Sequence, residues 1–230
     1  MHFRHSSDIW SRFPSLVPMV LSVEGVTPDA NVDAAFERLL ARAKAHLAAG
    51  AEGESVPIQA WRRGFSAMGL KPTQYRCAAE ALLRRLRKDG QLPRLHPLVD
   101  LCNALSVAWA LPVAVLDLDG IEGDLTVRAA TGSEEHLEFS GAVEHPEPGE
   151  VIFADAGNRT HARRWCHRQS ARSVIQPQTT RALIVVEALH EGAPADVQAA
   201  IDDLVACLTQ AGMRCSAAKL LRPGDPDFAC

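Results

Sequence analysis

Hydrophobic residues recur at helical spacing mainly in the first half of the chain and in short runs of strand length mainly in the second. Apolar residues three and four positions apart predict five helices. These cover residues 27–50, 57–68, 76–88, 98–109 and 194–211. Short apolar or alternating runs bounded by turn residues predict strands. These cover residues 16–23, 113–116, 125–129, 136–139, 151–154, 173–175, 181–188 and, as a closing edge strand, 213–221.

Helices clustered ahead of strands are typical of an α+β fold, whereas a regular doubly wound fold alternates the two along the whole chain. We therefore predict a mixed β-sheet with the N-terminal helices packed on it. The 230 residues contain no internal repeat and no low-complexity segment. We take residues 1–230 as a single domain, which is a length that buries a substantial core.

A polar stripe interrupts the apolar pattern of the helix predicted at 98–109. Asp100, Asn103 and Ser106 are spaced three residues apart and therefore share one side of that helix. The helix ends at Leu111 and Pro112, and a buried strand follows at once. A polar stripe that leads into a core strand can form the wall of a pocket. A solvated helix face explains the same pattern.

Charge is distributed unevenly along the chain, although the net charge is only −4. Residues 61–99 contain nine Lys or Arg against two acids, residues 100–160 two against twelve, and residues 161–181 five against none. The net charge argues against bulk electrostatic capture of nucleic acid. The two basic blocks can form one positive patch if the fold brings them together, and a plain solvated surface is the alternative.

The six cysteines show no disulfide or zinc spacing, so we expect a reduced, cytoplasmic protein. His161, Cys166 and His167 lack a fourth ligand at a usual offset, and no metal or other cofactor is expected. The apolar run at 16–23 is interrupted by Pro18 and has no cleavage site, so an early strand explains it better than a signal peptide. No apolar stretch reaches the length of a membrane span.

An ordered series of residues resembles the B3/B4 tRNA-binding (editing) domain of the phenylalanyl-tRNA synthetase β subunit, especially its free-standing relatives. The resemblance is strongest over residues 60–190. The residues that carry it are Pro72, Tyr75, Arg76, 80–85, Val99, Asp100, Asn103, Pro112, 116–119, 121–123, Val127, Arg128, Gly149, Glu150, Asp155, 164–170, Thr180 and 185–187. The resemblance implies an α+β fold and hydrolysis of the ester of mischarged tRNA.

The resemblance transfers the family's pocket to this chain only in part. It implies catalytic roles for Asn103 and Glu187, which match the family's Asn and Glu. Cys102 stands at the family's Thr position and Ala114 at its His position, and the family's Gly-rich segment is replaced by residues 164–170. These departures alter the groups suited to a tyrosine hydroxyl. The implied substrate-binding residues are Asp100, Ser106, Ala114, Trp165 and Arg168.

Residues 163–170 surround one tryptophan with cationic or titratable side chains. Trp165 can stack a base or an amino-acid ring while arginines contact phosphates, or it can be a core residue. We predict RNA contacts at Arg84, Arg85, Arg163 and Arg164. Glu187 lies within an apolar strand, so it must be paired or face a cavity.

We therefore predict a trans-editing aminoacyl-tRNA deacylase whose partner is the aminoacylated 3′ end of tRNA, with no membrane partner. The chain has no Gly-x-Ser-x-Gly elbow and no phosphate-binding Gly-rich loop. An activated ester is open to attack by water, so a site without a protein nucleophile suffices. A non-catalytic tRNA or amino-acid binding module of the same fold, and a small-molecule hydrolase, are the alternatives. We expect Asp100, Asn103, Trp165, Arg168 and Glu187 to converge on one concave site.

Overall fold

The computed structural model describes residues 1–230 and contains six α-helices in chain order. They are α1 (Ser7–Arg12), α2 (Asp33–Ala49), α3 (Val56–Ala67), α4 (Ala78–Asp89), α5 (Pro97–Trp109) and α6 (Ala193–Gln210). Three short 3₁₀ turns are η1 (Glu52–Glu54), η2 (Leu118–Gly120) and η3 (Ala171–Ser173). Most helices start and end at residues suited to those positions. Ser55 caps α3, and Gly90 ends α4 in the left-handed conformation at φ 72°.

The first sheet is mixed and has the strand order β13-β1-β4-β7-β8-β5-β6, with β9 paired to β8. Its strands are β1 (His2–His5), β4 (Leu125–Ala129), β5 (Glu135–Leu137), β6 (Val143–Glu144), β7 (Val151–Ala154), β8 (Arg159–Arg163), β9 (Arg168–Gln169) and β13 (Asp227–Ala229). The β1–β4 and β5–β8 pairs are parallel, and the others are antiparallel.

The second sheet is antiparallel throughout and has the strand order β11-β2-β10-β3, with β12 also paired to β2. Its strands are β2 (Val17–Glu24), β3 (Val113–Asp117), β10 (Arg181–Ala188), β11 (Arg214–Cys215) and β12 (Lys219–Leu220). The strand β10 is almost wholly buried. Apolar residues on both faces of such a strand show that the second sheet is covered on both sides.

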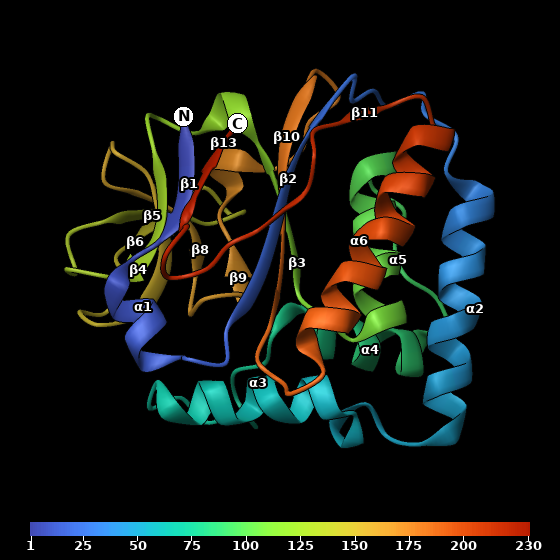
Figure 1. The fold of residues 1–230 in the computed structure, drawn as a ribbon, viewed down its shortest axis with the longest axis horizontal. Coiled ribbons are helices and arrows are strands. Elements are labelled where there is room, and N and C mark those ends of the chain that lie inside the picture. The colour runs from blue at the N-terminus through green and yellow to red at the C-terminus, as the bar shows by residue number, and fades with distance from the viewer.

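The molecule has three layers, which Figure 1 shows from left to right as the first sheet, the second sheet and the helices α2, α4, α5 and α6. The helix α3 runs along the lower edge, and both chain ends lie near the top of the first sheet. One core cluster of 58 buried residues runs through all three layers. The space between the two sheets therefore belongs to the same packed interior as the helical layer.

The structure confirms the predicted α+β class with a mixed sheet and packed helices, and it divides the strands between two sheets. The strands predicted at 125–129, 151–154 and 181–188 are confirmed to the residue. Three predictions are wrong in detail. The helix predicted from residue 27 begins at Asp33, residues 173–175 form no strand because Ser173 is the last residue of a 3₁₀ turn, and the run 213–221 is broken into β11 and β12.

Sequence patterns did not find β1, α1, β6, β8, β9 or β13. These elements are only two to six residues long, too short for a period to show. None of the helices combines the length and the apolar character that a membrane crossing needs. All six cysteines are free thiols.

Candidate functional site

A cavity of about 80 Å³ lies between the two sheets, and we call it the Glu187 cavity. Its wall combines β10, β3 with the residue before it, and the turn after β8. Its lining residues include Pro112, Val113, Trp165, Cys166, His167, Arg168, Gln169 and Glu187. Ala114 and Phe153 add apolar surface. Segments far apart in the sequence therefore meet here.

The residue Glu187 is buried, and the fold supplies hydrogen-bond partners for only one of its two carboxyl oxygens. Its Oε1 accepts a hydrogen bond from Trp165 Nε1 at 2.9 Å and lies 2.7 Å from His5 Nε2. The residue is 2% exposed, and its second oxygen, Oε2, has no hydrogen-bond partner in the fold. Oε2 itself keeps accessible surface, so water or a ligand can reach it from the cavity. Glu187 lines the cavity, so a bound group can supply that partner.

Trp165 is held in an unusual backbone conformation. Both Arg164 (φ 44°) and Trp165 (φ 60°) adopt positive φ, which is uncommon for residues other than glycine. Trp165 N donates to Val151 O at 2.7 Å, and the indole packs edge-on against Trp61 and Phe13. The side chain is fully buried. Trp165 is thus a core residue whose indole N–H also fixes the carboxyl group of Glu187.

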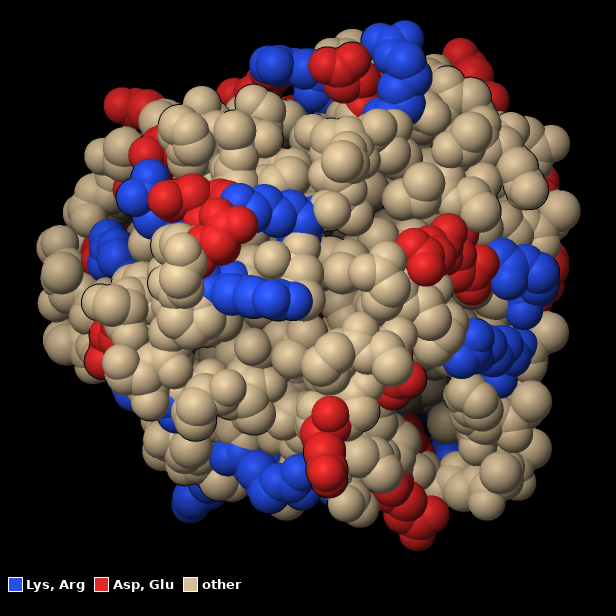
Figure 2. Space-filling model, viewed as in Figure 1, with Lys and Arg blue, Asp and Glu red and all other residues tan.

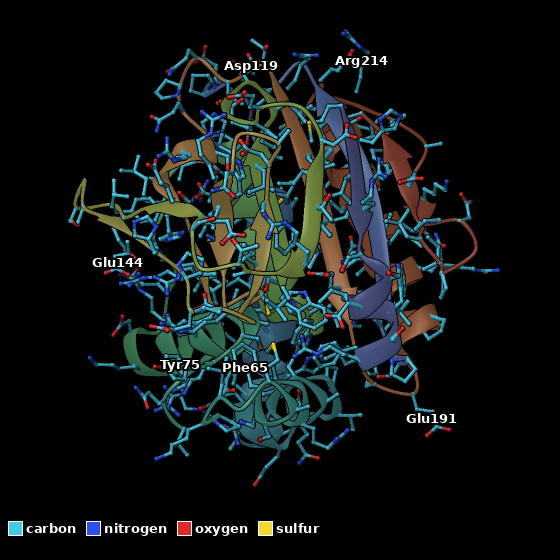
Figure 3. The ribbon with its side chains drawn as sticks, turned by 90° about the vertical axis from the view of Figure 1, so that its left-hand side faces the viewer. Phe65, Tyr75, Asp119, Glu144, Glu191 and Arg214 are labelled. Carbon is cyan, nitrogen blue, oxygen red and sulfur yellow. The ribbon has the colours of Figure 1, made fainter.

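His167 closes one side of the Glu187 cavity. Its ring packs edge-on against Phe65 and Tyr75, which Figure 3 labels beneath the strands of the first sheet. Its Nδ1 lies 2.8 Å from the carbonyl oxygen of Arg76. Burial lowers the pKa of His167, and the nearby Arg164 and Arg168 lower it further. The turn after β8 is therefore anchored to the start of α4.

A second and larger hollow, of about 480 Å³, lies beside the first, and we call it the Asn103 pocket. It is formed between α5, β3 and the segment that follows η3. Polar groups in its wall come from His96, Asn103, Gln169 and Gln176, and Leu95 and Phe139 are among its apolar residues. Leu95 and Phe139 are 70% and 69% exposed, respectively. Gln169 lines both hollows.

Two of the three residues in the polar stripe of α5 have structural partners. Asp100 is buried and accepts hydrogen bonds from Leu95 N at 2.7 Å and Arg94 Nε at 2.8 Å. Ser106 donates to Leu111 O at 2.6 Å, across the helix end where Ala110 adopts φ 55°. Only Asn103 lines a pocket. The stripe therefore divides into two side chains that hold the helix ends and one that faces open space.

The five residues expected to converge do so incompletely. Trp165, Arg168 and Glu187 line the Glu187 cavity, as Ala114 does, whereas Asn103 lies in the adjoining pocket. Asp100 lines neither. Arg168 pairs with Glu138 at 3.0 Å and is half exposed. The placement of Asp100 in one shared site is wrong, because its carboxyl group is taken up by Arg94 and a backbone N–H.

The arginines predicted to contact RNA differ in accessibility. Arg163 is 4% exposed and is held by Glu144 at 2.7 Å and Glu150 at 3.0 Å, so its placement on an exposed patch is wrong. Arg84 and Arg85 are about half exposed on α4 and pair with Glu52 and Asp89, respectively. Arg164 stacks over the ring of Tyr75.

Positive charge forms no continuous sheet on the face drawn in Figure 2, where basic and acidic groups alternate in small clusters. A separate basic hollow lies at the end of α4, formed by Arg84, Arg85, Arg87 and Lys88 with Glu52 and Asp89. The first basic block of the sequence thus gathers in part on one helix. In the second basic block, residues 161–181, four of the five arginines form ion pairs with residues of the acidic block.

A second buried acid and histidine lie in a row of three residues: Asp155 after β7, His161 in β8 and Ser173 at the end of η3. His161 Nδ1 lies 2.9 Å from Ser173 Oγ, and its Nε2 lies 3.2 Å from Asp155 Oδ2. Burial alone would raise the pKa of Asp155, but hydrogen bonds from His161 and from the N–H groups of Arg159 and Glu122 lower it below the usual range. Ser173 is fully buried and lines neither hollow, so this row is no accessible nucleophile site.

Sequence reasoning missed two residues that line the hollows, Gln169 and His96, and one that holds Glu187, His5. His5 holds Glu187 from β1, a strand too short to give a pattern. Gln169 belongs to the quoted segment 164–170, but nothing in that segment distinguishes it. His96 precedes Pro97 at the start of α5, where its Nδ1 accepts from Leu98 N at 3.2 Å. No group of three or more His, Cys, Asp or Glu side chains is arranged to hold a metal ion.

Comparison with known proteins agrees with this architecture. The family model for the B3/4 domain matches residues 60–210. The phenylalanine–tRNA ligase β subunits of Fusobacterium nucleatum and Cereibacter sphaeroides are 34% and 35% identical over 74 residues. Each alignment covers 32% of this chain and 9% of the relative, so the chain matches only a small part of those subunits.

A solved structure shares the fold at low sequence identity. It is the crystal structure of an N-terminal fragment of the phenylalanyl-tRNA synthetase β-subunit from Pyrococcus horikoshii, with a TM-score of 0.50 and 11% identity. The match covers 93% of this chain and 49% of that chain. The resemblance predicted from the sequence is thereby confirmed at the level of family and fold.

Proposed function

This chain belongs to the B3/4 domain family, and on that premise we propose that it hydrolyses the ester of mischarged aminoacyl-tRNA, acting in trans. The relatives' names, phenylalanine–tRNA ligase β subunit, supply the substrate class. The Glu187 cavity supplies the place for the aminoacyl group. The observation that carries the proposal is the unpartnered Oε2 of Glu187 on the wall of the Glu187 cavity.

An acid in this position suits the α-ammonium group of an aminoacyl ester. His5 and Trp165 fix Oε1, so the carboxyl group is oriented before the ligand arrives. Oε2 then accepts a hydrogen bond from the ammonium group, and that bond is charge-assisted. Because the ammonium group is present in both substrate and transition state, Glu187 contributes mainly to binding.

Hydrolysis needs no protein nucleophile in such a site. Water attacks the ester carbonyl carbon, the bond from that carbon to the ribose oxygen breaks, and the ribose oxygen takes a proton. The protein holds the ester, places the water and donates hydrogen bonds to the developing oxyanion. Unpaired backbone N–H groups and neutral amide side chains meet these requirements.

The size of the Glu187 cavity restricts the amino acid. At about 80 Å³ it is smaller than an engineered cavity of about 150 Å³ that admits benzene. Trp165 and Phe153 occupy the space beside it. We therefore propose that the preferred aminoacyl groups have side chains smaller than an aromatic ring.

RNA binding is assigned to the exposed cations of α4 and to Arg164. Arg84 and Arg85 remain in this proposal, and Lys88 joins them in the same hollow. If three or four single-strand phosphates are contacted, the slope of log affinity against log salt is roughly −2 to −3. A flat salt dependence would contradict the RNA assignment and favour a hydrolase of small acyl compounds.

The experiment that tests the proposal is a deacylation screen with tRNAs charged with amino acids from alanine and serine to phenylalanine and tyrosine. We expect the wild-type protein to release small amino acids faster than the spontaneous rate, and aromatic ones slowly or not at all. If the protein binds charged tRNA but accelerates no release, it is a binding module. If it hydrolyses simple aminoacyl esters with no advantage for tRNA, it is a small-molecule hydrolase.

A further inference from the structure

The wall of the Glu187 cavity contains one permanent positive charge, on Arg168. Of the five arginines in the second basic block, Arg168 alone lines this cavity. His167 lines it too, but burial lowers the pKa of His167, and the nearby Arg164 and Arg168 lower it further. At neutral pH the charged side chains on the wall are therefore those of Glu187 and Arg168.

The two charged side chains lie at different depths. Glu187 is 2% exposed, whereas the side chain of Arg168 is 51% exposed. The acid thus belongs to the interior, and the guanidinium group lies near the mouth, in contact with both the cavity and solvent. A ligand whose positive end meets Glu187 therefore has its other end near Arg168.

The fold orients Arg168 without using all of its donors. Its backbone belongs to β9, which lies beside β8 and places Arg168 opposite Arg163 (Figure 1). Nη1 donates to Glu138 Oε1 at 3.0 Å, and Glu138 is itself 8% exposed. Nε and Nη2 make no hydrogen bond within the fold. Because a guanidinium group has five N–H donors, Glu138 holds the group in place and leaves donors for a ligand.

A bound aminoacyl ester brings its carbonyl group to this cation. When the α-ammonium group meets Glu187 Oε2, the carbonyl carbon is only two bonds away from the ammonium nitrogen. A nucleotide is too large for a cavity of about 80 Å³, so the RNA remains outside. The ester, which joins the aminoacyl group to the RNA, therefore lies at the mouth, where Arg168 is.

The charge on the carbonyl oxygen changes during hydrolysis. Water adds to the carbonyl carbon, and the electron pair of the C=O double bond moves to the oxygen, which becomes an oxyanion. The pair returns, the bond to the ribose oxygen breaks, and one proton of the attacking water ends on that oxygen. The other proton passes to solvent when the released carboxyl group ionises. A guanidinium group interacts weakly with the neutral ester and strongly with the oxyanion and the carboxylate.

We propose that Arg168 binds the negative oxygen on the carbonyl carbon, first in the oxyanion and then in the carboxylate of the released amino acid. This inference rests on the proposed deacylase function. Glu187 meets an ammonium group that keeps its charge throughout, so Glu187 contributes mainly to KM. Arg168 acts on a charge that the ester lacks and the transition state has, so it contributes mainly to kcat.

Arg168→Ala tests this division in steady-state kinetics. We expect kcat to fall about 10- to 100-fold, the loss of one charge-assisted hydrogen bond, with a smaller change in KM. The same fall is expected on charged tRNA and on alanine ethyl ester, because both contain the ester carbonyl. Arg168→Lys, which keeps the charge without the planar fork, is expected to lie between. Arg181→Ala is the matched control, since Arg181 is also half exposed and ion-paired but lines neither hollow.

Chemical rescue distinguishes an acting guanidinium group from a structural one. Guanidinium chloride, at concentrations far below those that unfold proteins, is expected to restore part of the kcat of Arg168→Ala on alanine ethyl ester. Sodium chloride at the same concentration is expected to restore none. Equal restoration by both salts would overturn the inference. So would a folded Arg168→Ala protein that retains full kcat, or one in which only KM changes.

Binding of free amino acids separates this inference from the deacylase. Alanine has a carboxylate where alaninamide has a neutral amide, so the wild type is expected to bind alanine more tightly in calorimetric titrations, and Arg168→Ala to bind the two alike. If the wild type hydrolyses no ester, the deacylase is overturned, but a preference for alanine that Arg168→Ala loses still supports the assignment of Arg168. If the wild type shows no preference, or Arg168→Ala keeps it, the assignment is overturned whatever the outcome for hydrolysis.

Discussion

Glu187 and Asp155 are both buried acids beside a buried histidine, but the fold uses them differently. Asp155 is saturated: its Oδ1 accepts from Arg159 N at 3.0 Å, and its Oδ2 accepts from Glu122 N at 3.1 Å and lies beside His161. Glu187 has both of its partners on Oε1 and none on Oε2. The Asp155 cluster lines neither hollow, whereas Glu187 lines a cavity.

The difference shows why residue type alone does not identify a site. Asp155, His161 and Ser173 form a row with the composition of a hydrolytic triad, but the row is enclosed: all three residues are buried and none of them lines either hollow. The Glu187 cluster has no nucleophile and yet retains an unfilled acceptor in open space. An unfilled polar atom beside a cavity is the feature that calls for a ligand. We therefore assign structure to the first cluster and binding to the second.

The largest expected effect is on stability, from Asp155→Ala. Removing this acid leaves His161, Arg159 and two backbone N–H groups without their acceptor, and breaking a buried pair costs about 3–5 kcal/mol. Urea denaturation is the measurement, with Asp124→Ala as an exposed control that changes the free energy of unfolding by less than about 1 kcal/mol. An Asp155→Ala protein of wild-type stability would contradict the structural assignment.

The next effect depends on pH and concerns His136, which is buried in the same sheet. Burial, with Arg163 nearby, lowers the pKa of His136 from 6.5 to about 4. The unfolded chain then binds more protons than the folded one between these values. His136 therefore contributes stability that is complete above pH 6.5 and is lost as pH falls toward 4, up to roughly 3 kcal/mol.

Denaturation at pH 7, 5.5 and 4.5 measures this dependence. The variant His136→Gln, which keeps a polar group beside Thr160, is expected to have a shallower pH dependence over the same range. Identical pH profiles for the two proteins would show that His136 is not the titrating group.

Glu187→Gln is expected to change binding rather than stability. Its amide oxygen can still accept from Trp165, but the charge that meets the substrate ammonium is lost. A hydrogen bond to a charged group contributes about 1.5–3 kcal/mol, so KM is expected to rise roughly 10- to 100-fold with a smaller change in kcat. Steady-state deacylation kinetics is the measurement. A fall in kcat with KM unchanged would assign Glu187 to the chemical step instead.

The smallest effect is expected from Ser173→Ala. The change removes one neutral hydrogen bond to His161, which costs about 1 kcal/mol of stability. The kinetic constants for deacylation are expected to equal those of the wild type. Loss of activity in a stable Ser173→Ala protein would mean that the buried row opens and acts as a nucleophile.

The sequence predicted the long elements of this fold because their patterns extend over several turns or alternations. The strand 181–188 and the helix at 98–109 are examples, and the acid at 187 within an apolar strand correctly pointed to a pairing or a cavity. Short strands such as β1 and β9 gave no pattern, so His5 and Gln169 were not expected beside Glu187.

The sequence was less informative about individual polar residues, because their partners lie far along the chain. Asp100 and Asn103 belong to one stripe. Only the fold shows that the carboxyl group of Asp100 pairs with Arg94, while Asn103 faces a pocket. Arg163 has the sequence context of an exposed basic run and is held by acids 13 and 19 residues away. Spacing along a helix or a run of charge does not determine such pairings.

The most direct test of the central claim follows both clusters at once by NMR. The ligand is adenosine carrying alanine through an amide at the 3′ position, which the protein cannot hydrolyse as an ester. We predict that the indole N–H resonance of Trp165, assigned with Trp165→Phe, and the ring signals of His5 shift on saturation, while those of His161 do not. An unshifted Trp165 signal at saturating ligand, or a shift confined to His161, would contradict the account.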